Sequence, residues 1–466
     1  PVPVQELRNH PRGAVPLPRE APPAAPEAAP AGTGAGTATF ASVWAVGEFR
    51  ALWLAQLLSV AGDQLARVAI TVLVYDRTRS ALLSAVAFAV TFLPWVVGGL
   101  GLSGLADRRP RRQLMIVCDL ARMVLVGVMA LASLAGAATA LWIMVALLFV
   151  VTLIDSPFKA ARSALMPDIL TGEKYVLGTA VTQLTFQSGT VAGYALGGVV
   201  VAGLGPRDAL LVDAATFAAS ALLLRFGVRP RPAARPGAAG RRGSAGGQPD
   251  GRGGGGQVES RGGPGRAAMA EMAAGIRLVF GDRTLRTLML YGWLVAFYVV
   301  PMGLAAPYAA GFRALPLPVG AGLVFAAVPF GTAVGAVVVG RLVPPAMRRR
   351  ALGPMAVVAC GVLTLCWTHP GLAASLGIFA LAGAFAAYQV AANAAFVAAI
   401  PPGRRGQAFG LANGGMQVTQ GLWFIAAGAA AEATSPAAVI AASGLLGAIG
   451  AVVLTASHRA GHQRAP

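Results

Sequence analysis

Charged residues are scarce in this sequence. They form 12% of its 466 residues, whereas soluble globular domains carry about 25%. Hydrophobic residues form 56% and the mean hydropathy is +0.67. A chain of this length with so little charge cannot cover itself with polar surface. The composition therefore predicts a polytopic membrane protein rather than a soluble one.

Cysteine, histidine and lysine are also rare, and their scarcity excludes several classes of site. The three cysteines lie in apolar runs, so no disulfide framework is indicated. The four histidines lie in tails or a loop, and no HExxH motif occurs, so we expect no metal centre. The only lysines are Lys159 and Lys174, and neither follows a glycine. A GxxxxGK phosphate loop is therefore missing, and we expect neither ATP-driven transport nor any cofactor.

The net charge of +19 does not indicate nucleic-acid binding, because the arginines sit in short blocks between apolar runs. Those runs are each close to the length of about 20 residues that a membrane-spanning helix needs. They predict twelve spans in two sets of six. The first set lies at 51–75, 80–103, 114–135, 140–157, 178–203 and 209–226, and the second at 284–306, 318–340, 351–368, 371–398, 407–430 and 435–456.

The remaining segments divide the chain into domains. Residues 1–45 are rich in Pro, Ala and Gly and lack the apolar core of a signal peptide, so they predict a disordered tail. Two six-helix bundles are expected at 46–226 and 283–456. The basic segment 227–282 between them predicts a flexible linker ending in a short helix on the membrane surface, and 457–466 forms a second tail.

Basic residues predict the orientation of the chain in the membrane. With the N-terminus in the cytoplasm, the outer loops carry only Arg77, Arg79, Arg207 and Arg313. The short inner loops carry many more: Arg108, Arg109, Arg111, Arg112, Lys159, Arg162, Lys174, Arg341, Arg348, Arg349, Arg350, Arg404 and Arg405. Because positive charge is retained inside, both termini and the linker are predicted to be cytoplasmic.

The stretch "GLADRRPRRQ", from Gly104 to Gln113, is the densest of these inner loops. It resembles the loop 2–3 signature of the major facilitator superfamily, GxLaDrxGrkxxl, at Gly104, Asp107, Arg108, Arg111 and Arg112, with Pro110 where glycine is usual. Three further stretches resemble a bacterial branch of putative drug, macrolide and siderophore exporters: "LLSVAGDQLARVAITVLVYDRTRS" in span one, "DSPFKAARSALMPDIL" after span four and "LVDAATFAASALLL" in span six. The resemblance covers roughly residues 49–456.

The resemblance implies that two bundles rock about a central cavity and that proton flow drives export. It also implies that Asp107 packs against the N-terminus of span eleven, near Gly406 and Gln407, where the helix dipole attracts a carboxylate. The second half has no equivalent aspartate, so this lock is expected on one side only.

"GTVAGYALGG" in span five resembles the antiporter signature that ends in GPxxGG. Gly193, Gly197 and Gly198 match it, while Tyr194 replaces the proline. Ordinary packing of small residues between helices explains the same pattern.

Four acids fall within predicted spans, where charge is expensive. Asp63 is the main candidate for proton coupling, with Arg67 one turn away on the same face; the alternative is a structural pair. Asp155, just before Pro157, either takes part in coupling or gating with Asp107 and Arg112, or caps the segment that follows it. The remaining two are interpreted as structural: Asp119, paired with Arg122, and Asp213.

Polar residues in the second half suggest a substrate cavity. Gln389 and Asn393 share a face of span ten, and span seven offers Tyr298. Asn413, Gln417 and Gln420 share a face of span eleven. Hydrogen bonding between helices is the alternative for all of them and is favoured for span eleven.

The sequence thus predicts an all-α transporter of the major facilitator type in a bacterial cell membrane. We expect it to work as a monomer and to couple proton movement to transport of a small organic molecule. An uptake permease of the same fold and a transport-inactive sensor or scaffold are the alternatives. An enzyme is not expected, because no nucleophile and base occur together.

The orientation can be tested with single cysteines introduced at Ser244 in the linker and at Thr434 between spans eleven and twelve. Because the basic loops are predicted to lie inside, an impermeant thiol reagent added to intact cells should label the Thr434→Cys variant only. Labelling of both variants from outside would contradict the orientation.

Overall fold

The computed structural model describes residues 39–94, 109–134, 138–231, 264–401 and 404–462. Every regular element among them is helical. The first half contains α1 (Phe40–Trp44), α2 (Gly47–Thr78), α3 (Ala81–Ala89), α6 (Arg111–Ala132), α7 (Ala138–Ile169) and α8 (Glu173–Gly227). The second half contains α9 (Pro264–Gly281), α10 (Arg283–Trp293), α11 (Val295–Tyr298), α12 (Val300–Gly303), α13 (Ala305–Ala309), α14 (Leu317–Leu342), α15 (Pro345–Gly361), the 3-10 helix η1 (Val362–Thr368), α16 (Leu372–Phe385), α17 (Tyr388–Ala399), α18 (Arg405–Ala433) and α19 (Pro436–His462).

Nine helical segments among the described residues are long and apolar enough to cross a membrane. One of them, α8, consists of two helices joined at Gly205, whose φ of 83° is non-helical. Short helices α10 to α13 together occupy predicted span seven, and α18, with its polar glutamines, occupies predicted span eleven. Predicted span two begins in α3, and part of it lies outside the described residues. The order of segments along the chain is the predicted six plus six.

The predicted boundary of span four was wrong. We placed its end at residue 157 and assigned Lys159 and Arg162 to a loop, but α7 continues through Pro157 and Pro167 to Ile169. Proline is tolerated inside membrane helices because neighbouring groups satisfy the backbone groups it frees. As a result, one helix carries Asp155, Lys159 and Arg162. The spacings of four and three residues put about one helical turn between each residue and the next.

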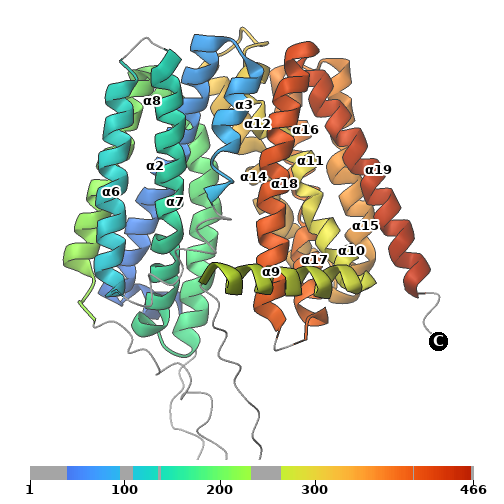
Figure 1. The fold of residues 1–466 in the computed structure, drawn as a ribbon, viewed down its shortest axis with the longest axis horizontal. Coiled ribbons are helices and arrows are strands. Elements are labelled where there is room, and N and C mark those ends of the chain that lie inside the picture. Colours follow the sequence, from blue (N-terminus) through green and yellow to red (C-terminus); the bar gives the residue numbers. More distant parts are fainter. Residues whose placement is uncertain (1–38, 95–108, 135–137, 232–263, 402–403, 463–466) are drawn as a thin grey trace, which may run out of the picture. The chain divides into compact units, whose positions relative to one another are not determined.

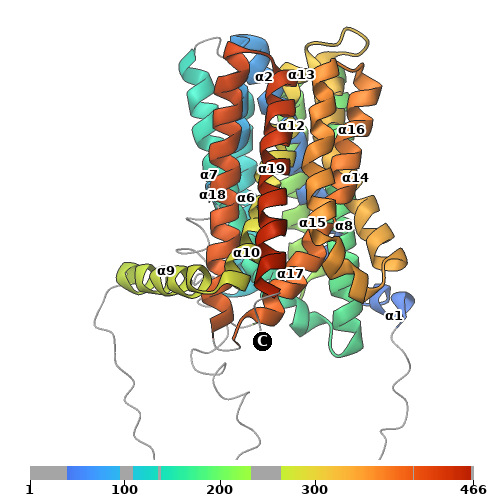
Figure 2. The same ribbon diagram turned by 90° about the vertical axis from the view of Figure 1, so that its right-hand side faces the viewer.

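The helices of the two halves run side by side, and α9 lies across one end of them (Figures 1 and 2). The C-terminal end of α19 lies at this same end, as does α1. Asp282 separates α9 from α10 and caps the latter, accepting hydrogen bonds from the N–H groups of Thr284 and Leu285 at 2.7 and 3.0 Å. Helix α9 therefore occupies the end of the linker, where a short helix was predicted.

Small residues bring the two halves into backbone contact between α8 and α14. A Cβ added at Gly198 would lie 2.5 Å from the Pro318 carbonyl oxygen and 3.1 Å from the Gly322 Cα. On α8, Gly193 and Gly197 lie against Ala61 and Leu65 of α2 in the same way. The glycines of the GPxxGG-like stretch therefore act in helix packing, which was one of the two interpretations of that pattern.

A second contact between the halves is polar and lies at the end of the bundle opposite α9, which we call the Glu432 end. The Glu432 carboxylate, near the end of α18, accepts hydrogen bonds from the Ser80 hydroxyl and, at 3.2 Å, from the Leu82 N–H. These donors form the N-terminus of α3, where the helix dipole attracts negative charge. The sequence did not predict this carboxylate contact between the halves, and the expected lock of Asp107 lies outside the described residues.

We expect Glu432→Gln to loosen the Glu432 end. The amide can still accept a hydrogen bond but loses the charge, which is worth about 0.5–1 kcal/mol at a helix N-terminus and corresponds to a two- to fivefold shift in population. Ala85 packs fully buried against Gly428 at this contact. An Ala85→Cys reporter, in a background without natural cysteines, should therefore react two- to fivefold faster with maleimide.

Asp76→Asn is the matched control, because Asp76 pairs at 3.0 Å with Arg79 within one half at the same end. It should leave the reporter rate unchanged. Equal rates in the Glu432→Gln variant and the parent would contradict the lock.

Candidate functional site

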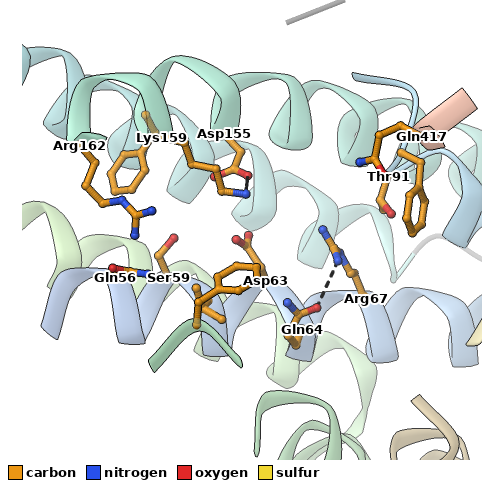
Figure 3. A pocket seen from close by; sticks show the side chains of 14 residues that line it. Gln56, Ser59, Asp63, Gln64, Arg67, Thr91, Asp155, Lys159, Arg162 and Gln417 are labelled. Carbon is orange, nitrogen blue, oxygen red and sulfur yellow. Dashed lines mark hydrogen bonds and ion pairs between the residues drawn. The ribbon is translucent and has the colours of Figure 1, made fainter. Parts of the chain in front are cut away.

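A cavity of about 150 Å³ lies along α2 in the first half and is lined by charged and polar side chains (Figure 3). Successive turns of α2 contribute Gln56, Ser59, Asp63 and Arg67 to its wall. The spacing of three to four residues places these side chains on one face of the helix. Its other charged and polar lining residues are Gln64, Asp155, Lys159, Arg162, Thr91 and Gln417.

Arg122 of α6 holds the Asp63 carboxylate from behind this wall. Two hydrogen bonds of 2.7 and 2.9 Å join its Nη2 to the two Asp63 oxygens. The Arg122 side chain is 0% exposed, whereas Asp63 is 21% exposed and reaches the cavity. The guanidinium also lies 4.2 Å from the centre of the Phe217 ring. Asp63 thus presents to the cavity a carboxylate whose charge is balanced by a fully buried cation.

Arg122 is shared with two further carboxylates. Its Nη1 lies 3.7 Å from Asp119 and 3.8 Å from Asp155, beyond ordinary hydrogen-bond distance. Asp155 makes its short contact with Lys159 instead, at 2.5 Å, one helical turn along α7. A single arginine therefore stands between acids from three helices, α2, α6 and α7.

Our pairing of Asp63 with Arg67 was wrong. Arg67 donates to the Gln64 side chain at 3.3 Å and to the Tyr194 hydroxyl at 3.4 Å. Both residues lie on one face of α2, as predicted, but the closer approach of α6 lets Arg122 take the carboxylate. Tyr194, which occupies the proline position of the antiporter-like stretch, therefore binds a charged residue of the cavity.

The two acids interpreted as structural are buried beside the cavity. Asp119 is 0% exposed and accepts a 2.6 Å hydrogen bond from Ser220, in addition to its longer contact with Arg122. Asp213 is 1% exposed and accepts from Thr216 at 3.3 Å. Among the described residues, one Asp119 oxygen and the Arg122 Nε have no hydrogen-bond partner. The network is thus incompletely satisfied in this arrangement.

Arg111 and Arg112 of the loop signature tie α6 to the ends of neighbouring helices. Arg111 pairs with Asp168 at 2.6 Å, and Arg112 donates to the carbonyl oxygens of Leu224 and Arg225. A cation at these carbonyls is favourable because they form the C-terminal end of α8. Asp155 does not join Arg112, and it lies within α7 rather than at a cap, so these two expectations were wrong. The contact expected between Asp155 and Asp107 lies outside the described residues.

The other predicted gate residues, Gly104, Asp107 and Arg108, lie outside the described residues. The structure does not describe their contact with span eleven.

The residues of the second half that were predicted to line a substrate cavity have different surroundings. Gln389 donates to the Tyr298 hydroxyl at 2.9 Å and to the Gly292 carbonyl oxygen at 3.2 Å, which is the hydrogen bonding between helices that we considered as the alternative. Asn393 is exposed on α17. Gln417 of α18, for which we favoured that alternative, lines the cavity instead.

Sequence reasoning missed Lys159, Arg162 and Arg122 as parts of one site. The signal for the first two was present, because Asp155, Lys159 and Arg162 follow the spacing of a helix face once Pro157 is allowed inside a helix. No group of His, Cys, Asp and Glu that could hold a metal ion occurs in the described part of the chain. The charged side chains that line the cavity make it suited to binding charged groups.

The sequence profile of the Major Facilitator Superfamily matches residues 52–377. The chain belongs to this superfamily. Its fold class is therefore the predicted one, and the family indicates a membrane transporter rather than an enzyme. No curated protein matches the chain.

Solved structures of transporters share the fold. A mutant of the nucleoside transporter NupG superposes with a TM-score of 0.65 at 12% identity, covering 88% of this chain and 99% of that one. A bacterial homolog of the human lysosomal transporter Spinster gives 0.61 at 16% identity over 88% and 96% of the two chains. A bacterial homologue of the iron transporter ferroportin gives 0.61 at 15% identity over 90% and 99%. Identities this low show that the fold is shared, and they give no information about the substrate.

Arg122→Leu should be strongly destabilising. It leaves the Asp63, Asp119 and Asp155 carboxylates without their common cation, and breaking a buried pair in this way costs about 3–5 kcal/mol. The midpoint of thermal unfolding in detergent, followed by tryptophan fluorescence, measures the loss.

Arg111→Leu, on the same helix, provides the comparison because its partner Asp168 is 40% exposed. We expect it to cost about 1 kcal/mol or less. Equal losses for the two variants would show that Arg122 does not hold the network together.

Proposed function

We propose that this protein is a proton-coupled exporter of a small organic molecule, acting by alternating access in the plasma membrane of a bacterium. The observation that carries the proposal is the cluster of Asp63, Arg122, Asp155 and Lys159, which places titratable groups beside a cavity lined by α2 and α7. Ionisable residues in membrane spans are expensive and mark ion or substrate pathways. Because no phosphate-binding loop occurs in the sequence, the driving force has to be a gradient.

Proton coupling follows from the way Arg122 is shared. When Asp63 takes up a proton, its two hydrogen bonds with Arg122 lose their ionic character, and Asp155 and Asp119 lie nearest to the arginine, at 3.8 and 3.7 Å. A shift of the guanidinium toward them changes how α2 packs against α6 and α7. The unsatisfied Arg122 Nε and Asp119 oxygen are consistent with a second arrangement of the network.

The contacts between the halves supply the elements that move. In the present arrangement α8 packs on α14 at Gly198, and Glu432 accepts hydrogen bonds at the N-terminus of α3. This arrangement favours a state closed at the Glu432 end, and under the proposed orientation that end faces outward. Two of the similar structures are titled inward-facing. Both termini are proposed to be cytoplasmic, and the transporter to work as a monomer.

The proposed direction of transport rests on the resemblance to exporters of the stretches in span one, after span four and in span six. The likeness to transporters titled for nucleosides, iron and 5-aminolevulinic acid gives no direction of its own. A growth screen of a bacterial host with and without the protein, against many toxic compounds, tests export and yields a substrate. Increased resistance supports export, and increased sensitivity supports uptake.

With a substrate from that screen, Asp63→Asn tests the coupling site. In proteoliposomes with a pH gradient, the variant should no longer concentrate substrate against its own gradient, because position 63 can no longer exchange a proton. Downhill exchange should continue. Asp208→Asn, close to the break at Gly205, is the control and should transport like the parent.

Uphill transport by Asp63→Asn at equal expression would move the coupling site elsewhere, with Asp155 next to test. A variant that fails to insert or fold would show that the pair with Arg122 is structural.

A further inference from the structure

The charges on the cavity wall are unequally paired. Asp63 and Asp155 are its acidic lining residues, and each already has a cation, Arg122 at 2.7 Å and Lys159 at 2.5 Å. Three cations line the same cavity: Arg67, Lys159 and Arg162. The wall therefore presents more positive than negative charge to whatever occupies the cavity.

Two of these cations have no carboxylate partner. Among the described residues, Arg67 bonds only to the neutral groups of Gln64 and Tyr194, and Arg162 makes neither an ion pair nor a hydrogen bond. Figure 3 shows them on opposite sides of the facing Asp63 and Asp155 carboxylates, with Arg162 on the side of Gln56 and Ser59. An arginine inside a membrane protein is costly without a partner, so an unpaired one marks a place for an anion.

Asp119 and Asp213 do not supply that partner. Asp119 and Arg122 are completely buried behind the wall, and Asp119 accepts a hydrogen bond from Ser220. Asp213 belongs to α8, where it accepts a hydrogen bond from Thr216, and it packs against Gly62 on the neighbouring face of α2. Neither residue lines the cavity that contains Arg162. On the helix of Arg162, Lys159 and Asp155 are paired with each other, and Asp168 is paired with Arg111.

The rest of the wall is apolar and aromatic. Val60, Phe92, Phe158 and Phe186 line the cavity together with the charges. A cavity of about 150 Å³ is of the size that holds a benzene molecule in other proteins, about 150 Å³. A ligand that fits has one compact apolar part and one charged group.

We propose that this cavity binds a small organic anion, whose carboxylate or similar oxyanion is held by Arg162 and whose apolar part lies against the phenylalanines. This assignment of a substrate class rests on the proposed function. Arginine suits the role because its planar guanidinium binds carboxylates and phosphates through two parallel hydrogen bonds. Gln56 and Ser59 add neutral donors on the same side of the cavity. An organic cation is disfavoured, because it would have to displace Arg122 from Asp63 or Lys159 from Asp155.

Benzoate, benzamide and benzylamine provide the test, since they share one ring and differ in charge. Binding to the purified protein in detergent is measured by isothermal titration calorimetry and by the shift of the thermal unfolding midpoint. Benzoate should bind, and neutral benzamide and cationic benzylamine should bind at least tenfold more weakly. Arg162→Gln should weaken benzoate binding about tenfold, as expected for loss of a charge-assisted hydrogen bond. Arg162→Lys should recover part of it.

Arg207→Gln is the matched control, because Arg207 is an exposed arginine at the Gly205 break of α8, outside the cavity. It should leave benzoate binding unchanged. Three results would each overturn the proposal: no binding of benzoate up to about 10 mM, equal binding of benzoate and benzamide, or preferred binding of benzylamine. Binding is measured without any gradient, so its failure is distinct from a failure of proton coupling in the Asp63→Asn assay.

Discussion

The first half of this protein depends on one fully buried arginine. Arg122 binds the Asp63 oxygens at 2.7 and 2.9 Å and lies within 4 Å of two more carboxylates, so α2, α6 and α7 share a single positive charge. A buried charge of this kind is a weak source of stability, because desolvation offsets most of the attraction. The contribution of Arg122 is to specify which helices pack together and in which register. Because three acids share one cation, this one contact ties together three helices.

The contacts between the halves differ in kind from those within the first half. α8 and α14 meet through glycine backbones, and an aromatic group of Phe88, Phe325 and Phe424 joins α3, α14 and α18 with ring centres 5.1 Å apart. Only the contact of Glu432 with α3 is ionic in character among the described hydrogen bonds that cross between the halves. Apolar and glycine contacts carry little directional preference, so one half can slide or tilt on the other without leaving buried charge unpaired. In the described part of the chain, the buried charged side chains all lie in the first half, away from that contact: Arg112, Asp119, Arg122, Asp155 and Asp213.

The sequence predicted the fold well and the site in part. Apolar runs and basic loops were enough for the order of spans, since membrane thickness and charge retention act on composition alone. Asp63 could be identified because an acid inside a span is expensive. Its partner could not, because Arg122 comes 59 residues later and the choice between it and Arg67 depends on how α6 is rotated against α2. Lys159 and Arg162 were assigned to a loop because Pro157 was taken as a helix end, although neighbouring helices can compensate for a proline.

Tyr194 belongs to two environments at once. Its hydroxyl accepts a hydrogen bond from Arg67 at the cavity, while its ring stacks on Phe325 of the other half, with 5.1 Å between centres and 15° between planes. The side chain is rigid and 1% exposed, so its two ends cannot move independently. Any event that displaces Arg67 must either break the hydrogen bond to the hydroxyl or turn the ring on Phe325. Tyr194 therefore couples the position of a cavity arginine directly to the packing between the two halves.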